Sequence, residues 1–134
     1  MNFPYLNLPG DLGDTPRPLV PVIYKSGNKE TKPILTLIDS GADYSYVTFK
    51  IAEYLDIKFN KIEPVSITGF EGSSISCWPF KTTIEVANGT LFLPIYYGGS
   101  LTKEYPCILG QDIFFDKTNI VFERSKWNFQ INWI

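Results

Sequence analysis

Short apolar runs, some of them alternating with polar residues, are separated by turn-forming residues along most of the chain. Such runs, bounded by Gly, Pro, Asn or Ser, predict β-strands. Asn88-Gly89 predicts a two-residue hairpin turn, because both central residues of a type I′ turn need positive φ angles. Turns are also expected at Ser26-Gly27-Asn28 and near Arg124–Lys126. The predicted strands are Leu19–Lys25, Lys32–Ile38, Val65–Thr68, Ser74–Phe80, Thr82–Ala87, Thr90–Tyr97, Tyr105–Leu109, Ile120–Glu123 and Trp127–Ile134.

Helical spacing of apolar residues is confined to short segments. The apolar positions from Val47 to Leu55 predict a helix over Thr48–Leu55, capped by Ser45 or Thr48. Asp112–Lys117 suggests one or two further helical turns. The sequence therefore predicts an all-β, mostly antiparallel domain with one or two short helices.

The first eighteen residues follow a different pattern. Met1–Pro18 contains four prolines and two glycines and has no sustained periodicity, which predicts an irregular N-terminal arm. The folded domain is then expected to span residues 19–134, a length typical of one domain.

Composition narrows the partners and the compartment. The net charge is −2 with only 12 Lys and Arg residues, so we expect no nucleic-acid partner. Apolar stretches are too short for a membrane span and no signal peptide is apparent, so we expect a soluble, cytoplasmic protein without a membrane partner. The two cysteines, Cys77 and Cys107, are predicted to be buried free thiols.

The absence of histidine removes several kinds of catalytic site. Ser–His and Cys–His nucleophilic systems and most catalytic zinc sites require an imidazole, because it changes charge near neutral pH. Any hydrolytic chemistry must therefore depend on carboxylates, and we expect neither a cofactor nor a metal.

The strongest candidate carboxylate is Asp39, in the triplet Asp39-Ser40-Gly41. It directly follows the apolar strand residues Leu35–Ile38, and Gly41 permits a tight turn before a helix. From the triplet alone, an ordinary strand-to-helix turn with Asp39 as a solvated or capping residue is the simpler interpretation.

Two later segments make that interpretation less attractive. Thr68–Ser73 is glycine-rich and lies between two predicted strands, which predicts a hairpin tip that could close over a bound peptide. Ile108-Leu109-Gly110 ends another apolar strand before a helical turn, although core packing alone would also explain it.

In this order and spacing, the motifs resemble those of the retropepsin-like aspartic proteases, single-domain homodimeric relatives of pepsin. The resemblance covers residues 19–134 and implies a small closed antiparallel β-barrel of the acid-protease type. It also implies roles for individual residues. Asp39 matches the catalytic aspartate, and Ser40 matches the hydroxyl residue that locks the two active-site loops together. Gly41 and Ala42 match the small residues beneath the substrate. The flap tip is matched by Gly69, Phe70, Glu71 and Gly72, and the element that braces the active-site loop is matched by Ile108, Leu109 and Gly110.

The activity that the resemblance implies is hydrolysis of extended peptides by an aspartate pair, with one Asp39 from each subunit of a homodimer. One alternative is a catalytically silent relative that serves as a dimerisation or peptide-binding module, and another is a β-barrel binding protein in which the triplet is coincidental. Terminal strands usually join the subunits in this family. The apolar positions of the last strand are expected either to form that interface or to close the chain's own core; they are Trp127, Phe129, Ile131, Trp133 and Ile134.

Overall fold

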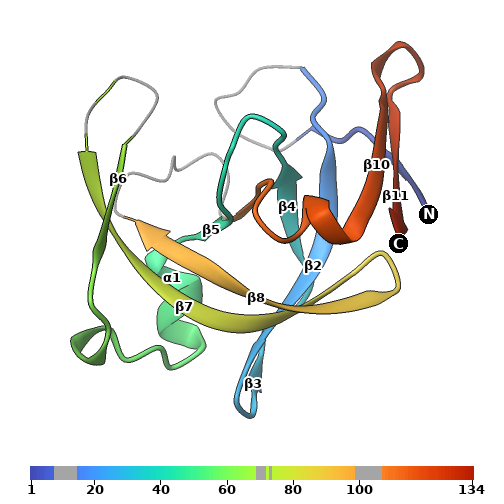
Figure 1. The fold of residues 1–134 in the computed structure, drawn as a ribbon. Coiled ribbons are helices and arrows are strands. Elements are labelled where there is room, and N and C mark those ends of the chain that lie inside the picture. Colours follow the sequence, from blue (N-terminus) through green and yellow to red (C-terminus); the bar gives the residue numbers. More distant parts are fainter. Residues whose placement is uncertain (8–14, 69–71, 73, 99–106) are drawn as a thin grey trace.

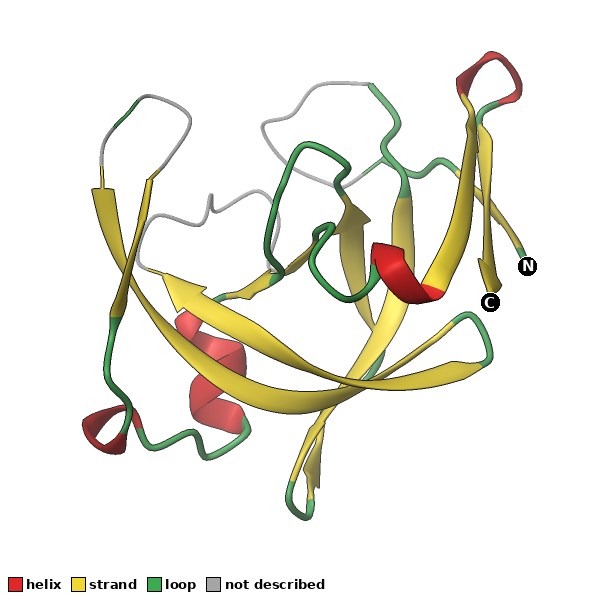
Figure 2. Cartoon of the chain, viewed as in Figure 1, coloured by secondary structure: helices red, strands yellow, loops and turns green. Residues whose placement is uncertain are grey.

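Most of the chain forms two β-sheets in the computed structural model, which describes residues 1–7, 15–68, 72, 74–98 and 107–134. Figure 1 labels the elements and Figure 2 colours them by type. The strands are β1 (Asn2–Pro4), β2 (Leu19–Ser26), β3 (Lys29–Glu30), β4 (Ile34–Ile38), β5 (Tyr46–Val47), β6 (Val65–Thr68), β7 (Ser74–Val86), β8 (Gly89–Gly98), β9 (Cys107–Leu109), β10 (Thr118–Glu123) and β11 (Asn128–Trp133). One α-helix, α1 (Phe49–Tyr54), and three 3₁₀ turns, η1 (Phe59–Lys61), η2 (Phe115–Lys117) and η3 (Arg124–Lys126), complete the described elements.

The larger sheet closes on itself. Its strand order is β3-β2-β4-β9-β5-β8-β7-β6, and an additional pairing of β2 with β7 joins six of these strands into a ring. β4 pairs with β9 and β5 pairs with β8 in parallel, whereas the other four neighbours in the ring are antiparallel. The predicted all-β fold, a small closed barrel with one or two short helices, is confirmed.

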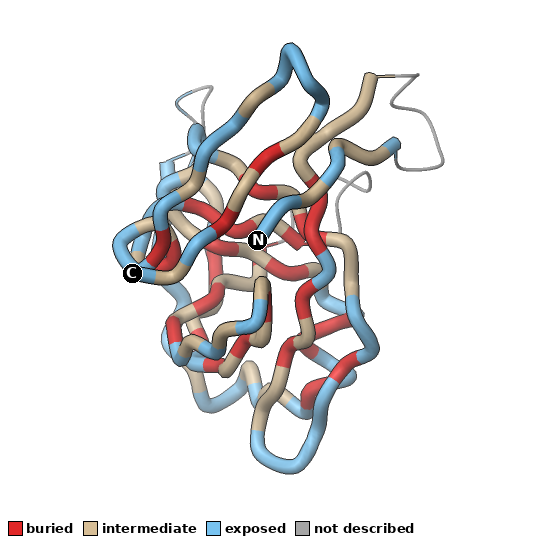
Figure 3. Tube along the Cα trace, turned by 90° about the vertical axis from the view of Figure 1, so that its right-hand side faces the viewer, coloured by how far each residue is buried: buried red, intermediate tan, exposed pale blue. Residues whose placement is uncertain are grey.

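The barrel interior is the hydrophobic core. Figure 3 shows buried segments gathered along the strands and exposed segments at the turns. Alternate residues of β2 point inward, so that Val22 and Tyr24 are fully buried, and Ile84, Leu93 and Ile95 face them from β7 and β8. Burial of this inward face fixes the strand register, because a shift by one residue would expose it to water.

β7 is a single strand of thirteen residues, although the sequence predicted separate strands over Ser74–Phe80 and Thr82–Ala87. Its first part pairs with β6, its last part pairs with β2, and β8 follows it from Cys77 to Val86. Lys81 is exposed within this ladder and does not interrupt it.

The β7–β8 turn is displaced by one residue from the predicted position. Ala87 and Asn88 are its two central residues, with φ angles of 49° and 63°, and Gly89 pairs with Val86 as the first residue of β8. A Cβ atom at Gly89 would lie 2.1 Å from the indole of Trp133. Glycine is therefore needed at this position to admit the Trp133 ring.

The smaller sheet, with strand order β1-β11-β10, packs the C-terminal strand against the chain's own core. Phe129 and Ile131 of β11 are fully buried, whereas Trp127, in a left-handed conformation before the strand, is 44% exposed and Ile134 is 90% exposed. Of the two expectations for this strand, closure of the chain's own core therefore holds for Phe129 and Ile131.

The N-terminal segment contributes to this smaller sheet. The expectation of an irregular arm over residues 1–18 is wrong for β1, which pairs antiparallel with β11. Phe3 stacks on Phe129 with ring centroids 5.4 Å apart. The sequence could not reveal this pairing, because β1 is only three residues long and its partner lies at the other end of the chain. The domain boundary after residue 18 stays a prediction.

The predicted first helix is confirmed as α1, with Thr48 as its N-cap and Leu55 as its C-cap. Thr48 is thus the N-cap residue, as one of the two predicted alternatives, but its side chain makes no capping hydrogen bond, and the Ser45 hydroxyl accepts a hydrogen bond from the Gly110 N–H group instead. Among the described helices, none is long and apolar enough to cross a membrane.

We expect Gly89→Ala to lower the free energy of unfolding by about 2 kcal/mol, because the new methyl group must displace the Trp133 ring. The Trp133 Nε1–H group would then lose its hydrogen bonds to the carbonyl oxygens of Val86 and Ala87, each 3.1 Å long. Urea denaturation of both single variants and of the Gly89→Ala/Trp133→Ala double variant measures the coupling. If Gly89→Ala lowered the free energy of unfolding equally in the parent and in the Trp133→Ala protein, that result would contradict the contact between Gly89 and Trp133.

Candidate active site

Asp39 lies at the point where β4 leaves the barrel. The preceding residue, Ile38, is buried, whereas Asp39 is half-buried and Ser40 and Gly41 are exposed. One carboxylate oxygen of Asp39, Oδ1, accepts a hydrogen bond of 2.9 Å from the Gly41 backbone N–H group. The Asp39 carbonyl oxygen accepts another from the Ala42 N–H group at 3.2 Å. The turn therefore orients the Asp39 carboxylate by its own backbone and leaves it open to solvent on one side.

The loop that carries Asp39 has both of its ends fixed to the same strand. It joins β4 to β5, and β9 lies between these two strands. Ile108 pairs with Leu37 on the β4 side and with Tyr46 on the β5 side. The Asp39 N–H group also donates to the carbonyl oxygen of Leu109 at 3.0 Å. The loop from residue 39 to residue 45 therefore passes over the end of β9.

Gly110 is the residue directly beneath this loop. A Cβ atom at this position would lie 2.2 Å from the Tyr44 carbonyl oxygen and 2.6 Å from the Ala42 carbonyl oxygen. Its N–H group donates to the buried Ser45 hydroxyl at 3.1 Å. Backbone atoms cannot move aside as a flexible side chain can, so this close approach requires glycine.

The structure thus brings together two of the predicted sets of site residues, the loop from Asp39 to Ala42 and the segment Ile108–Gly110. Of the third set, the structure describes only Gly72. Gly69, Phe70 and Glu71 fall outside the described residues, and Gly72 is exposed with a φ angle of 81°. The β6–β7 hairpin that carries this set and the loop after β4 both lie on the upper side of the barrel in Figure 1.

Gln111 is a neighbour of the loop that the motif analysis did not select. Its side-chain Nε2 donates a hydrogen bond of 2.5 Å to the Ser40 carbonyl oxygen, and its backbone N–H group donates to the Ala42 carbonyl oxygen at 2.8 Å. Both hydrogen bonds connect the segment that follows β9 to the turn that holds Asp39. No signal in the sequence distinguishes this contact from that of an exposed polar residue after a glycine.

Three tyrosine side chains pack beside the loop. The Tyr96 ring centroid lies 5.0 Å from that of Tyr44 and 6.1 Å from that of Tyr46. Burial is the largest cause that raises the pKa of Tyr46 to about 12, and burial also raises the pKa of Tyr96. Both phenols therefore stay neutral at physiological pH and add no charge near the turn.

Neither cysteine is suited to act as a nucleophile. Cys77 and Cys107 are buried free thiols, as the sequence predicted. Burial raises the pKa of Cys107 to about 12 and also raises the pKa of Cys77. The thiolate is the reactive form, so these residues are inert at neutral pH.

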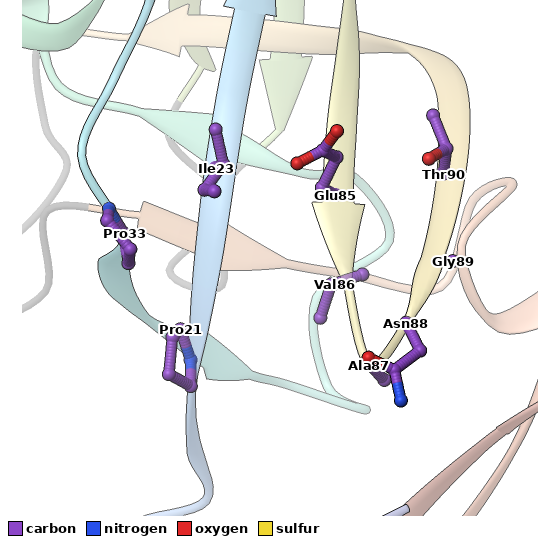
Figure 4. Close-up of a pocket in the computed structure, with 9 residues that line it drawn as sticks. All are labelled: Pro21, Ile23, Pro33, Glu85, Val86, Ala87, Asn88, Gly89 and Thr90. Atoms are coloured by element: carbon purple, nitrogen blue, oxygen red, sulfur yellow. The ribbon is translucent and has the colours of Figure 1, made fainter.

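Two hollows help to delimit the site. One of about 400 Å³ adjoins the loop and is lined by Asp43, Tyr44, Gln111, Asp112 and Asp116. Another, of about 340 Å³, lies at the β7–β8 turn, where Figure 4 shows Pro21, Ile23 and Glu85 among its lining residues. No residue of the Asp39 turn lines the second hollow, and its Glu85 carboxylate is paired with Lys25 at 2.6 Å. Only the first hollow is continuous with the Asp39 loop.

Comparison with solved structures identifies the fold. EIAV protease in complex with the inhibitor HBY-793 superposes with a TM-score of 0.58 over 81% of this chain and 93% of its own chain, at 23% identity. A retropepsin-like aspartic protease from Rickettsia conorii superposes with a TM-score of 0.65 over 99% of this chain and 91% of its own, at 14% identity. No protein-family model and no curated protein sequence matches the chain. The fold is that of the retropepsin-like aspartic proteases, as the sequence motifs indicated.

Replacing Ser45 with alanine tests the support beneath the loop. Ser45→Ala leaves the buried Gly110 N–H group without its acceptor, which should lower the free energy of unfolding by about 1–3 kcal/mol. Thermal and urea denaturation measure this loss. The control Ser76→Ala removes an exposed hydroxyl from β7 and should change stability little. Equal stabilities of the two variants would show that the Ser45 hydroxyl does not support Gly110.

Proposed function

We propose that this chain is one subunit of a homodimeric aspartic endopeptidase, in which Asp39 and its symmetry mate form the catalytic pair. The proposal is carried by the position of the Asp39 carboxylate at the open end of β4 in a retropepsin-like barrel, where it accepts a hydrogen bond from the Gly41 N–H group. The sequence in hand has one Asp-Ser-Gly triplet, so the proposal takes the second carboxylate from another copy of the chain. The proposed substrate is an extended peptide or protein segment.

Two carboxylates a few ångström apart cannot both ionise at low cost, so the pair shares one proton. The ionised member accepts a proton from a bound water as the water oxygen attacks the scissile carbonyl carbon. The protonated member donates to the carbonyl oxygen as negative charge develops there. The first carboxyl group then gives the proton it took from water to the amide nitrogen, and the second carboxylate takes back a proton from the tetrahedral intermediate as the C–N bond breaks. The two products leave, and the pair again shares one proton.

The remaining predicted residues have supporting roles in this proposal. Ser40 links the two loops across the dimer axis, and Gly41 and Ala42 provide room beneath the substrate. Gly69, Phe70, Glu71 and Gly72 form the tip of a flap that covers the substrate. The close packing of Gly110 against Ala42 and Tyr44 supports a bracing role for Ile108, Leu109 and Gly110.

The alternative is a catalytically silent module that uses the same fold to dimerise or to bind peptides. The intact triplet Asp39-Ser40-Gly41 favours the enzyme, because a silent module has no chemical need for it. The predicted cytoplasmic location stays a prediction under either function.

Asp39→Asn should lower kcat/KM by about a thousandfold or more, because the amide can neither accept the water proton nor share one with its mate. Cleavage of a denatured protein or a peptide library between acid and neutral pH measures this loss. The control Asp56→Asn makes the same chemical change at an exposed residue whose left-handed conformation asparagine also adopts. Equal cleavage by parent and Asp39→Asn would exclude the proposed chemistry.

Gln111 offers a test of loop positioning. Gln111→Met removes the donor to the Ser40 carbonyl oxygen and should lower kcat/KM about tenfold at every pH, because the turn is held less firmly. Gln111→Glu can donate only while protonated, so its activity relative to the parent should fall as the pH rises above about 4.3. If Gln111 only stabilises the fold, the activities of the two variants relative to the parent should depend on pH in the same way. That result would refute positioning of the turn by this hydrogen bond.

A further inference from the structure

A third hollow, of about 300 Å³, lies between α1 and the start of β4 and takes no part in the proposed catalysis. Its floor is apolar, with Ile34 from β4 and the buried Ile51 from α1, and the Tyr54 ring forms one wall. None of its lining residues belongs to the loop that carries Asp39 or to the β6–β7 hairpin. In Figure 1, α1 and β3 lie below the loop that follows β4.

Three lysines surround this apolar hollow. Lys32 and Lys50 line it, and the Lys29 amino group lies 6.0 Å from the centroid of the Tyr54 ring. In the described part of the chain, the ion pairs are those of Lys25 with Glu30 and Glu85 and that of Lys126 with Glu123, so none of the three lysines is paired there. No lining residue is acidic. A protein with a net charge of −2 thus carries a local positive rim around an apolar surface.

The carboxylates nearest in sequence do not line the hollow. Glu30 follows Lys29, and its Oε2 lies 3.5 Å from the Lys25 amino group, which also pairs with Glu85 at 2.6 Å. Glu53 is exposed on α1 and does not line the hollow. Unpaired ammonium groups beside an apolar surface attract an anionic ligand and orient it, because their charges are complementary.

We propose that this hollow binds an acidic peptide segment, in which an apolar or aromatic side chain enters between Ile34, Ile51 and Tyr54 and flanking carboxylates pair with Lys29, Lys32 and Lys50. The distribution of three cations around one apolar patch matches several carboxylates along a chain better than the single charge of a fatty acid. Tyr54 is 54% exposed, so a long alkyl chain would stay largely in water here.

The adjacent strand supplies a second reason for a peptide. Among the described strands, β3 is the last of the sheet on this side and has β2 as its single partner. An extended peptide can add main-chain hydrogen bonds to such an edge while its side chains enter a neighbouring pocket. Where the proposed peptidase activity also holds, this surface would bind a protein substrate at a second point, away from the scissile bond.

Binding is tested with the Asp39→Asn protein, so that no cleavage can occur. The probe is a fluorescent ten-residue peptide with one central Phe flanked by Glu residues, and fluorescence anisotropy measures its Kd. Two further peptides replace every Glu with Gln or the Phe with Ser. We expect the acidic Phe peptide to bind at least about tenfold more tightly than either, and its Kd to rise with salt, because both charge and apolar burial contribute.

Matched lysine variants locate the site. The Lys32→Gln/Lys50→Gln double variant should raise the Kd about tenfold, and the Lys58→Gln/Lys61→Gln control, which removes two exposed lysines outside the hollow, should leave it unchanged. Tyr54→Ala should also weaken binding. Equal effects of the two double variants, absence of measurable binding, or displacement of the peptide by palmitate would overturn the proposal. If the Asp39→Asn protein binds the peptide but the parent protein cleaves no substrate, the binding site proposed here would stand and the proposed peptidase activity would be rejected.

Discussion

The placement of β9 between β4 and β5 is the constraint on which the candidate active site depends. These two strands are the ends of the loop that carries Asp39, so the loop has to cross the end of β9. The crossing is possible because Gly110 has no side chain at a point where backbone oxygens of Ala42 and Tyr44 approach it. Hydrogen bonds from the Asp39 and Gly110 N–H groups then fix both sides of the crossing. In the proposed peptidase, a carboxylate held in this way would be oriented before the substrate binds, which would lower the entropic cost of the reaction.

Local patterns in the sequence predicted much of this architecture, because strand periodicity and turn chemistry depend on neighbouring residues. The strand Val65–Thr68 and the turn at Arg124–Lys126 agree with the structure, and α1 lies within its predicted bounds. The errors arise from distant contacts. The β7–β8 turn has Ala87 and Asn88 at its centre, and Gly89 packs against Trp133 from the other end of the chain. β1 becomes a strand because it pairs with the edge of β11.

The candidate site shows the same division between local and distant information. Asp39, Ser40 and Gly41 are recognisable as a motif, and the sequence order of the motifs indicated the fold that the structural comparisons identify. Gln111 was missed because its contact with the Ser40 carbonyl oxygen exists only once β9 lies under the loop. The lysine-rimmed hollow was missed for a similar reason, since Lys32 and Lys50 come from segments that meet only in the folded barrel.

The central claim is that two copies of Asp39 act together, and subunit mixing tests it most directly. Parent and Asp39→Asn chains are mixed, unfolded and refolded together, and the initial cleavage rate is measured at constant total protein. If catalysis needs both carboxylates, an equal mixture should retain about a quarter of the parent rate, because random pairing leaves about a quarter of the dimers with two aspartates. Retention of about half of the parent rate would mean that each chain acts alone, and would contradict the shared catalytic pair.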